Sequence, residues 1–214
     1  MSLFGNLFGK KEEQAAPVAA PQPIATGNEL TFDLTKGPVS LNPFDVVNLT
    51  KSDDTLTDIN LAAGWDPING IGENIDLDLS VHMFNGNGGH VETVYFGNLS
   101  TSGVKHSGDN LTGAGEGDDE VIRINLSALD PSVTRLEVTV TSFTKVRFRN
   151  ISNAFVRLVD NRSNREVARF DLTEHGGDNT AVRFGQFIKE NGEWKFKALG
   201  IYSKDTIRSF NQNL

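Results

Sequence analysis

The sequence predicts an all-β protein, mainly antiparallel, folded as a β-sandwich. After about residue 28, apolar and polar residues alternate in most segments, which is the pattern of strands with one buried face. Gly, Asn, Asp and Pro separate these segments, and no long amphipathic helix is apparent. A chain of 214 residues is long enough for one large all-β domain with a buried core.

Eleven segments carry the strand pattern. In chain order they are residues 29–34, 46–50, 57–63, 75–84, 90–96, 121–126, 135–143, 154–160, 166–172, 180–188 and 193–202. Three of the breaks have the composition of hairpin loops, namely NGNGG at 85–89, DNRSN at 160–164 and ENGE at 190–193. SALDPSVT at 127–134 is expected to form a single helical turn. We therefore place one β-sandwich domain over residues 28–214.

Two further segments precede this domain. Residues 1–11 are expected to form a short amphipathic segment, because four large apolar side chains share one arc of a helical projection and two lysines follow. These four are Leu3, Phe4, Leu7 and Phe8. Peripheral membrane contact is the expected role, with docking in a partner's groove and simple disorder as alternatives. Residues 12–27 are rich in Ala and Pro, which is typical of an extended linker.

The acidic residues are concentrated in two places. Lys and Arg total 20, and Asp and Glu total 28. Residues 65–78 hold four acids and residues 106–120 hold five, without a base in either, so the rest of the chain carries 20 bases and 19 acids. The excess is therefore local and indicates one or two concentrated sites. It also makes nucleic acid a poor partner.

Composition excludes several kinds of site. The chain has no Cys, so disulfides, thiolate metal sites and a Cys nucleophile are absent. No run approaches the roughly 18 consecutive apolar residues of a membrane-spanning helix, and no secretion signal is apparent. A cytoplasmic location is therefore expected.

The segment HSGDNLTGAGEGDDE at 106–120 has the composition of a metal-binding loop. Its glycines come too often for a helix or a ladder strand. Two carboxylates roughly 5 Å apart repel each other by about 3 kcal/mol at an effective dielectric of about 20, so a loop that gathers five needs cations or protons. Calcium accepts about six to eight oxygens in an adaptable geometry, whereas magnesium demands a stricter octahedron. The loop therefore favours calcium, with a spacing that differs from that of an EF-hand.

The other acidic segment supplies a partner for this loop. In the strand at 75–84, Asp76, Asp78 and Ser80 are expected on one face, and the intervening apolar residues on the other. Two carboxylates on a rigid strand beside an acidic loop predict a site for two ions. The simpler alternative is a solvated acidic turn that binds no ion.

Several motifs follow one another along the domain. They are GWDP at 64–67, DLDLS at 76–80, VYFGNLS at 94–100, HSGDNLTGAGEGDDE at 106–120, NAFVRLVD at 153–160, VARFDL at 167–172 and GEWKFKALG at 192–200. With these motifs, residues 28–202 resemble the TerD family of tellurium-resistance and stress-response proteins. Members of that family usually begin almost at once with the first strand, whereas this chain adds about 26 residues ahead of it.

The resemblance implies a calcium-binding β-sandwich. The metal ligands that it implies are Asp76, Asp78, Asp109, Asn110, Asp118, Asp119 and Glu120, with backbone contributions near Gly113 and Gly115 and with Asp66 and Asn98 as secondary candidates. The family is described by phenotype, namely resistance to tellurite and other stresses, phage defence, and association with membrane-linked Ter partners. The implied partners are thus other Ter-type proteins or a second copy of the chain.

Three classes of function are compatible with these features. The first is a non-catalytic calcium-binding adaptor of the stress-response type. Its expected location is the cytoplasm, including peripheral contact with the inner face of the membrane. The alternative is a structural subunit of a larger assembly or phage particle that calcium stiffens. The third is a hydrolase with paired carboxylates, but no GxSxG motif exists and the acids have no neighbouring base, so we expect no enzyme.

Some basic and aromatic residues allow two interpretations. KVRFRN at 145–150, with four arginines beyond it, would suit an anionic lipid or a tellurium oxyanion, but an ordinary solvated face explains it equally well. These arginines are Arg157, Arg162, Arg165 and Arg169. His106 either orients a ligand or is a hydrogen-bonded loop histidine. Trp65 and Trp194 are expected in the core.

Overall fold

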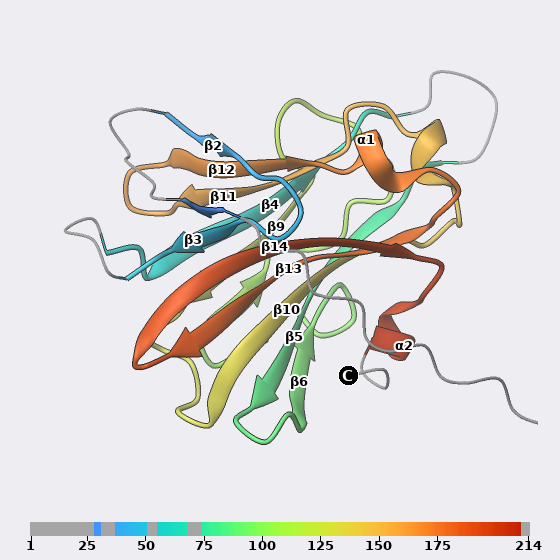
Figure 1. Cartoon of the computed structure of the whole chain (residues 1–214). Helices are drawn as coiled ribbons and strands as arrows, with labels where there is room; N and C mark the ends of the chain where they lie inside the picture. Colours follow the sequence, from blue (N-terminus) through green and yellow to red (C-terminus); the bar gives the residue numbers. More distant parts are fainter. Residues whose placement is uncertain (1–27, 31–36, 51–54, 68–73, 211–214) are drawn as a thin grey trace, which may run out of the picture.

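Two seven-stranded sheets pack face to face in the computed structural model, which describes residues 28–30, 37–50, 55–67 and 74–210 (Figure 1). The strand order is β1-β3-β14-β13-β10-β5-β6 in the first sheet and β2-β12-β11-β4-β9-β8-β7 in the second. The predicted β-sandwich is confirmed. The segments 1–11 and 12–27 lie outside the described residues.

The strand bounds follow the predicted segments closely. The first sheet contains β1 (Glu29–Leu30), β3 (Val46–Asn48), β14 (Glu193–Ser203), β13 (Ala181–Glu190), β10 (Val133–Ser142), β5 (Leu77–Asn85) and β6 (His90–Val94). The second contains β2 (Val39–Ser40), β12 (Arg165–Asp171), β11 (Phe155–Asp160), β4 (Asp58–Gly64), β9 (Glu120–Asn125), β8 (Val104–His106) and β7 (Ser100–Thr101). Each of the eleven predicted segments contains a strand, and the three expected hairpins join β5 to β6, β11 to β12 and β13 to β14.

The pairing is antiparallel apart from two short edge pairs, β1 with β3 and β2 with β12, which are parallel. The strands β2, β7 and β8 were not predicted. Each has only two or three residues, which is too short for an alternating pattern to be recognised.

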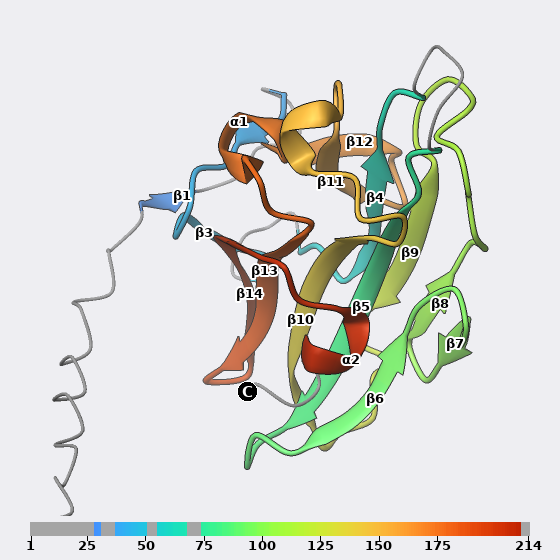
Figure 2. The same ribbon diagram turned by 90° about the vertical axis from the view of Figure 1, so that its right-hand side faces the viewer.

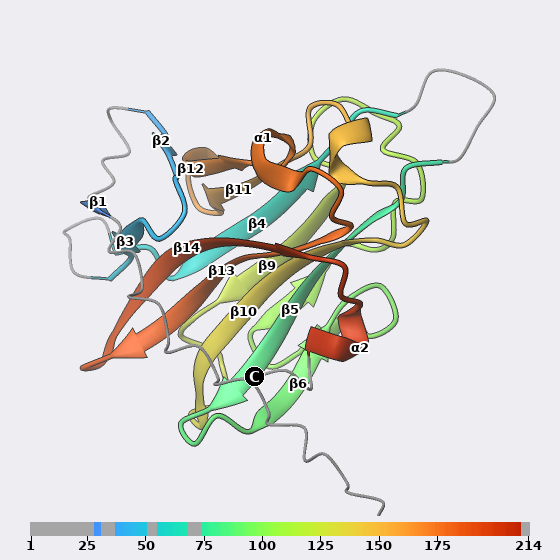
Figure 3. The same cartoon turned by 45° about the vertical axis from the view of Figure 1, so that its right-hand side comes forward.

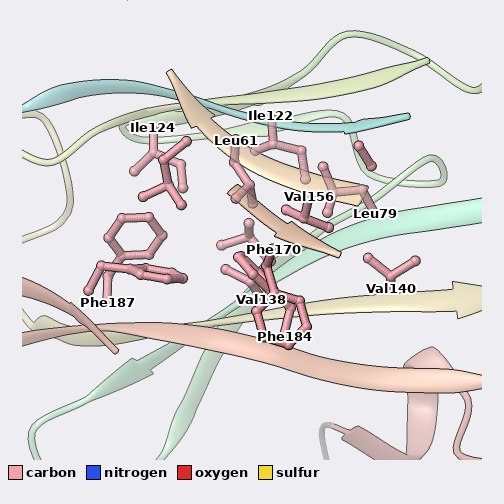
Figure 4. Close-up of a cluster of buried hydrophobic side chains, with 14 of the residues drawn as sticks. Leu61, Leu79, Ile122, Ile124, Val138, Val140, Val156, Phe170, Phe184 and Phe187 are labelled. Carbon is pink, nitrogen blue, oxygen red and sulfur yellow. The ribbon is translucent and has the colours of Figure 1, made fainter. Parts of the chain in front are cut away.

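The core lies between the inner faces of the two sheets (Figure 4). Leu61 and Ile122 enter it from the second sheet, and Leu79 and Val138 from the first. Each fully buried side chain of this size contributes roughly 1.5–3 kcal/mol through the hydrophobic effect. Trp65 and Trp194, on which 4% and 5% of the surface stays exposed, belong to the same core as predicted. The apolar positions of the alternating segments are therefore buried in the core, as the pattern predicted.

Helices are short in the described residues: η1 (Phe148–Asn150), α1 (Thr173–Gly176) and α2 (Ile207–Phe210). The helical turn expected at 127–134 is wrong. Two turns stand there instead, and the second is held by Asp130, whose side chain accepts hydrogen bonds from the backbone and hydroxyl of Ser132. The helix α2 lies against β5 and β6, where Phe210 contacts the His82 ring (Figure 3). Within the described part of the chain, no helix combines the length and apolar character needed to cross a membrane.

One stretch of β5 has an open edge. β6 pairs with β5 only from Val81 to Phe84, so the residues before Val81 have no strand partner on that side. The start of β9, from the other sheet, lies beside this open edge (Figure 2). The two acidic segments of the sequence meet here.

Candidate metal centre

Three carboxylates from the two acidic segments converge at the open edge of β5. Asp76, Asp78 and Asp109 each offer an oxygen atom, and these atoms all lie within 4.8 Å of one another. We call these three residues the acidic cluster. Asp76 and Asp78 flank Leu77, which points into the core, so the alternation of the strand turns both carboxylates away from the core. Asp109 comes from the loop between β8 and β9.

The acidic cluster is buried on the strand side and open on the loop side. Only 7% of Asp76 and 3% of Asp78 is exposed, whereas Asp109 is exposed. The hydroxyl of Thr141 donates a hydrogen bond of 3.4 Å to Oδ2 of Asp78. Oδ1 of Asp76 is buried without any hydrogen-bond partner among the described residues. A buried carboxylate oxygen in that condition is costly, and a cation would remove the cost.

The same arrangement raises the pKa values of the two buried acids. Burial, followed by the charges of Asp109 and Glu120, raises the pKa of Asp76 from 3.8 to about 6. Burial, followed by the charges of Asp76, Glu120 and Asp109, raises the pKa of Asp78 to about 8, although Thr141 opposes the shift. Both pKa shifts report the free-energy cost of ionising carboxyl groups that are buried and lie close to other acids without a counter-ion. The residues present therefore fit a hard, oxygen-binding cation.

Glu120 connects the second sheet to this centre. Its Oε2 accepts a 2.8 Å hydrogen bond from the backbone N–H of Leu79, and its Oε1 accepts one of 3.3 Å from the N–H of Asn110. The side chain is fully buried, and Nε2 of His106 lies 3.5 Å from Oε2. Because Nδ1 of His106 accepts a hydrogen bond from Gly108, the ring proton sits on Nε2 and faces Glu120. His106 is thus a buried histidine that contacts Glu120 and the loop backbone.

Other implied ligands shape the loop. The side-chain oxygen of Asn110 accepts hydrogen bonds from the backbone of Thr112 and Gly113, and its amide donates to Asp119 at 2.9 Å. Asp119 also accepts a 2.9 Å hydrogen bond from the N–H of Trp65. Gly113 has φ +62°, and a Cβ there would collide with the Trp65 ring, so both conformation and space require glycine. Asn110, Asp119 and Gly113 therefore fix the loop around Trp65.

The remaining implied ligands lie away from the acidic cluster or have other partners. Both oxygens of Asp118 accept hydrogen bonds of 2.8 Å from the Arg157 guanidinium. Asp66 accepts from the Asn153 amide, and the Asn98 amide donates to the Thr93 carbonyl and to Glu92. Gly115 is exposed in the loop. Asp118, a candidate from its place in the motif, is paired with an arginine 39 residues along the chain, and its role as a ligand stays a prediction.

Three of the four arginines that follow KVRFRN are paired with acids. Arg157 also pairs with Glu166, Arg169 pairs with the same Glu166, and Arg162 pairs with Asp160. These guanidinium groups already have carboxylate partners, which favours the interpretation of this face as an ordinary charged surface.

The protein-family model of the TerD domain matches residues 38–213 of the chain. The chain belongs to the TerD family. The resemblance stated from the motifs is confirmed, and the match spans nearly all of the described residues.

The chain is also similar to proteins that are named for tellurium resistance and stress response. The tellurium resistance protein TerZ of Serratia marcescens is 41% identical over 173 residues, which cover 76% of this chain and 89% of the relative. The tellurium resistance protein TerD of the same organism is 38% identical over 76% of this chain and 89% of its own length. General stress protein 16U of Bacillus subtilis is 38% identical over 80% of this TerD-family chain and 90% of its own length.

A solved structure shares the fold. It is a homologue of a telluride resistance protein (TerD) from Streptomyces coelicolor, with a TM-score of 0.65 and 24% identity over 73% of this chain and 95% of that one. At that identity the likeness concerns the fold alone, and it agrees with the two packed sheets described above.

Proposed function

We propose that this TerD-family chain is a non-catalytic calcium-binding module of a stress-response protein of the tellurium-resistance type. The observation that carries the proposal is the buried pair Asp76 and Asp78, which has a hydrogen-bond-free buried oxygen and lies within reach of the loop carboxylate Asp109. The family and the names of the relatives support the stress-response part of the proposal.

Calcium is the ion that these residues favour. The donors are hard carboxylate oxygens, and one of them is on a loop rich in glycine, which suits a large ion with an adaptable shell better than the strict octahedron of magnesium. The acidic cluster opens to solvent at Asp109, so an ion there would keep positions for outside oxygens. Two ions were expected from the sequence, and this number stays a prediction.

An adaptor role follows from what an ion would do to this end of the sandwich. Calcium would tie the loop that carries Asp109 to the start of β5, and would replace several negative charges at the surface with a neutral or positive centre. The metal state would thereby control contact with a partner, for which we propose other Ter-type proteins or a second copy of the chain. A cytoplasmic location belongs to the same proposal.

Thermal unfolding of the metal-stripped chain tests the proposal. Calcium should raise the melting temperature in proportion to the logarithm of its concentration, since only the folded chain presents the site. The shift should be much smaller for Asp78→Asn, and unchanged for Val91→Ala, an exposed residue of β6 near the β5–β6 hairpin, far from the acidic cluster. Equal stabilisation of the parent and Asp78→Asn would refute the site.

A further inference from the structure

Exposed apolar side chains gather beside the acidic cluster. Five large apolar side chains are exposed in the described residues, and three of them are joined to the centre by sequence or by a backbone hydrogen bond. Leu111 follows Asn110 in the loop, and the Leu99 carbonyl accepts a hydrogen bond from the N–H of His106. The N–H of Phe143 donates a 2.9 Å hydrogen bond to the carbonyl of Asp76. Phe143 is therefore tied directly to Asp76, and Leu111 lies two residues from Asp109, whereas Leu99 is linked through His106.

Phe143 is the most exposed of them, with 64% of its surface accessible. Its ring meets the edge of Phe96 at a centroid distance of 6.1 Å, and Phe96 contacts Tyr95 at 5.1 Å. Phe96 and Tyr95 come from the turn after β6, whereas Phe143 follows β10. We call these three residues the aromatic rim. Phe143 is exposed and Tyr95 and Phe96 are half-buried, so the aromatic rim presents apolar surface that is available for contact with another surface.

The turn that follows Phe143 is basic. Lys145 is exposed with φ 61°, in a turn closed by a hydrogen bond from its N–H to the Ser142 carbonyl. Arg147 and Arg149 follow, and both pair with the single acid Asp178. Three positive charges with one negative partner leave this turn positive, although the whole chain has a formal net charge of −8.

We propose that this end of the sandwich docks on an anionic phospholipid surface when calcium occupies the acidic cluster, with Phe143 entering the lipid interface and Lys145 beside headgroup phosphates. The inference rests on the proposed calcium site. Without an ion, the carboxylates of the acidic cluster would repel the phosphates. With an ion, the open side at Asp109 would offer coordination positions to phosphate oxygens, and the aromatic rim and basic turn would supply apolar and positive contacts.

A lipid surface fits these groups better than a second copy of the chain does. A symmetric contact would place the patch of one copy on the same patch of the other, so that the positive turn around Lys145 would meet either its own copy or an acidic cluster whose charge the bound ion has largely neutralised. An anionic lipid surface is complementary to that turn and accepts an exposed aromatic side chain at the headgroup level.

Co-sedimentation with vesicles tests the inference. The full chain is mixed with vesicles of phosphatidylcholine and phosphatidylserine, or of phosphatidylcholine alone, with calcium or with a chelator. Calcium should increase binding to the anionic vesicles only. Phe143→Ala should weaken this calcium-dependent binding by about tenfold or more, from the apolar area lost, and Lys145→Glu by about tenfold. Any contact made by residues 1–11 would be common to all variants and independent of calcium.

Two variants far from the acidic cluster serve as controls. Val91→Ala removes an exposed apolar side chain near the β5–β6 hairpin, and Lys189→Glu reverses a charge near the β13–β14 hairpin, both at the opposite end of the sheet. Both should bind vesicles like the parent. Light scattering without vesicles shows whether the chain is a monomer or a dimer when calcium is added.

The outcomes separate the inference from the calcium site on which it rests. If calcium binds to the chain in solution but vesicle binding does not depend on calcium or on Phe143, the docking inference is wrong and the calcium site stands. A calcium-induced dimer that Phe143→Ala abolishes would identify a second copy as the occupant and overturn the lipid assignment. If the chain does not bind calcium in solution, both proposals fail.

Discussion

The backbone N–H of Leu79 and the carboxylate of Glu120 form a 2.8 Å hydrogen bond across 41 residues of sequence. Leu79 lies on the part of β5 that β6 does not reach, so a side chain from the other sheet takes the place of a strand neighbour. The same carboxylate accepts the N–H of Asn110 at 3.3 Å, next to Asp109. One buried acid thus sets the distance between the strand and the loop of the acidic cluster.

Removing this acid should destabilise the fold as well as the site. Glu120→Ala leaves the Leu79 N–H buried without an acceptor, which we expect to cost about 2–4 kcal/mol together with the cavity. Glu120→Gln keeps an acceptor oxygen and should cost clearly less. Urea unfolding of the metal-free proteins measures both values. An equal loss in the two variants would show that the hydrogen bond to Leu79 is not what matters.

The metal-free chain should become less stable as the pH rises from about 4 to about 8. The folded pKa values of Asp76, about 6, and Asp78, about 8, lie above their usual value of 3.8. The folded state therefore binds more protons than the unfolded state in this interval, and the stability contributed by protonation is lost as the pH passes the folded values. Asp58 and Asp160 have lowered pKa values, so the stability that they contribute is lost only at lower pH, where they become protonated.

Melting temperatures of the metal-free chain, taken with a chelator across this pH interval, measure the loss of stability. Asp78→Asn, which cannot titrate, should give a flatter profile, and saturating calcium should remove the decline because the ion replaces the protons. An unchanged slope in Asp78→Asn would place the titrating groups elsewhere.

The strands and the acidic segments could be predicted from the sequence because each depends on local patterns. Alternation indicated β5 with Asp76 and Asp78 on one face, and the acidic excess indicated the loop 106–120, whereas Asp109 within that loop came from the resemblance to the TerD family. The partners of the other acids could not be predicted in this way. Asp118 stands beside Asp119 in one motif, yet Asp118 pairs with Arg157, 39 residues away, and Asp119 with the N–H of Trp65, 54 residues away. Which acids converge in the acidic cluster depends on sheet pairing, which no local pattern contains.

Asp118→Asn should therefore leave calcium binding nearly unchanged. The Arg157 pair is partly exposed, with 27% and 20% of the two side chains accessible, so its loss should cost only about 1 kcal/mol or less. Calcium affinity and urea unfolding are measured on the same preparation. A loss of affinity as large as that of Asp78→Asn would mean that Asp118 leaves Arg157 to bind the ion.

Gly113→Ala should disturb the loop through Trp65. The residue has φ +62° and its Cβ would collide with the indole, so we expect a loss of about 2–4 kcal/mol and a change in tryptophan fluorescence. Gly115→Ala, at φ +146° with open space around it, should cost about 1–3 kcal/mol from backbone strain without changing the fluorescence. If the two variants have the same fluorescence as the parent, the contact between Gly113 and Trp65 does not hold the loop.

Calorimetric titration of the metal-stripped chain with calcium, and then with magnesium, tests the central claim most directly. We expect saturable calcium binding, weaker binding of magnesium, and an affinity for calcium that rises between about pH 6 and pH 8 as Asp76 and Asp78 lose their protons. Asp78→Asn should reduce the affinity at least about tenfold, as expected when one of a few carboxylate ligands is lost. An absence of calcium binding at every pH, or an Asp78→Asn variant that binds as the parent does, would contradict the assignment of the acidic cluster as a calcium site.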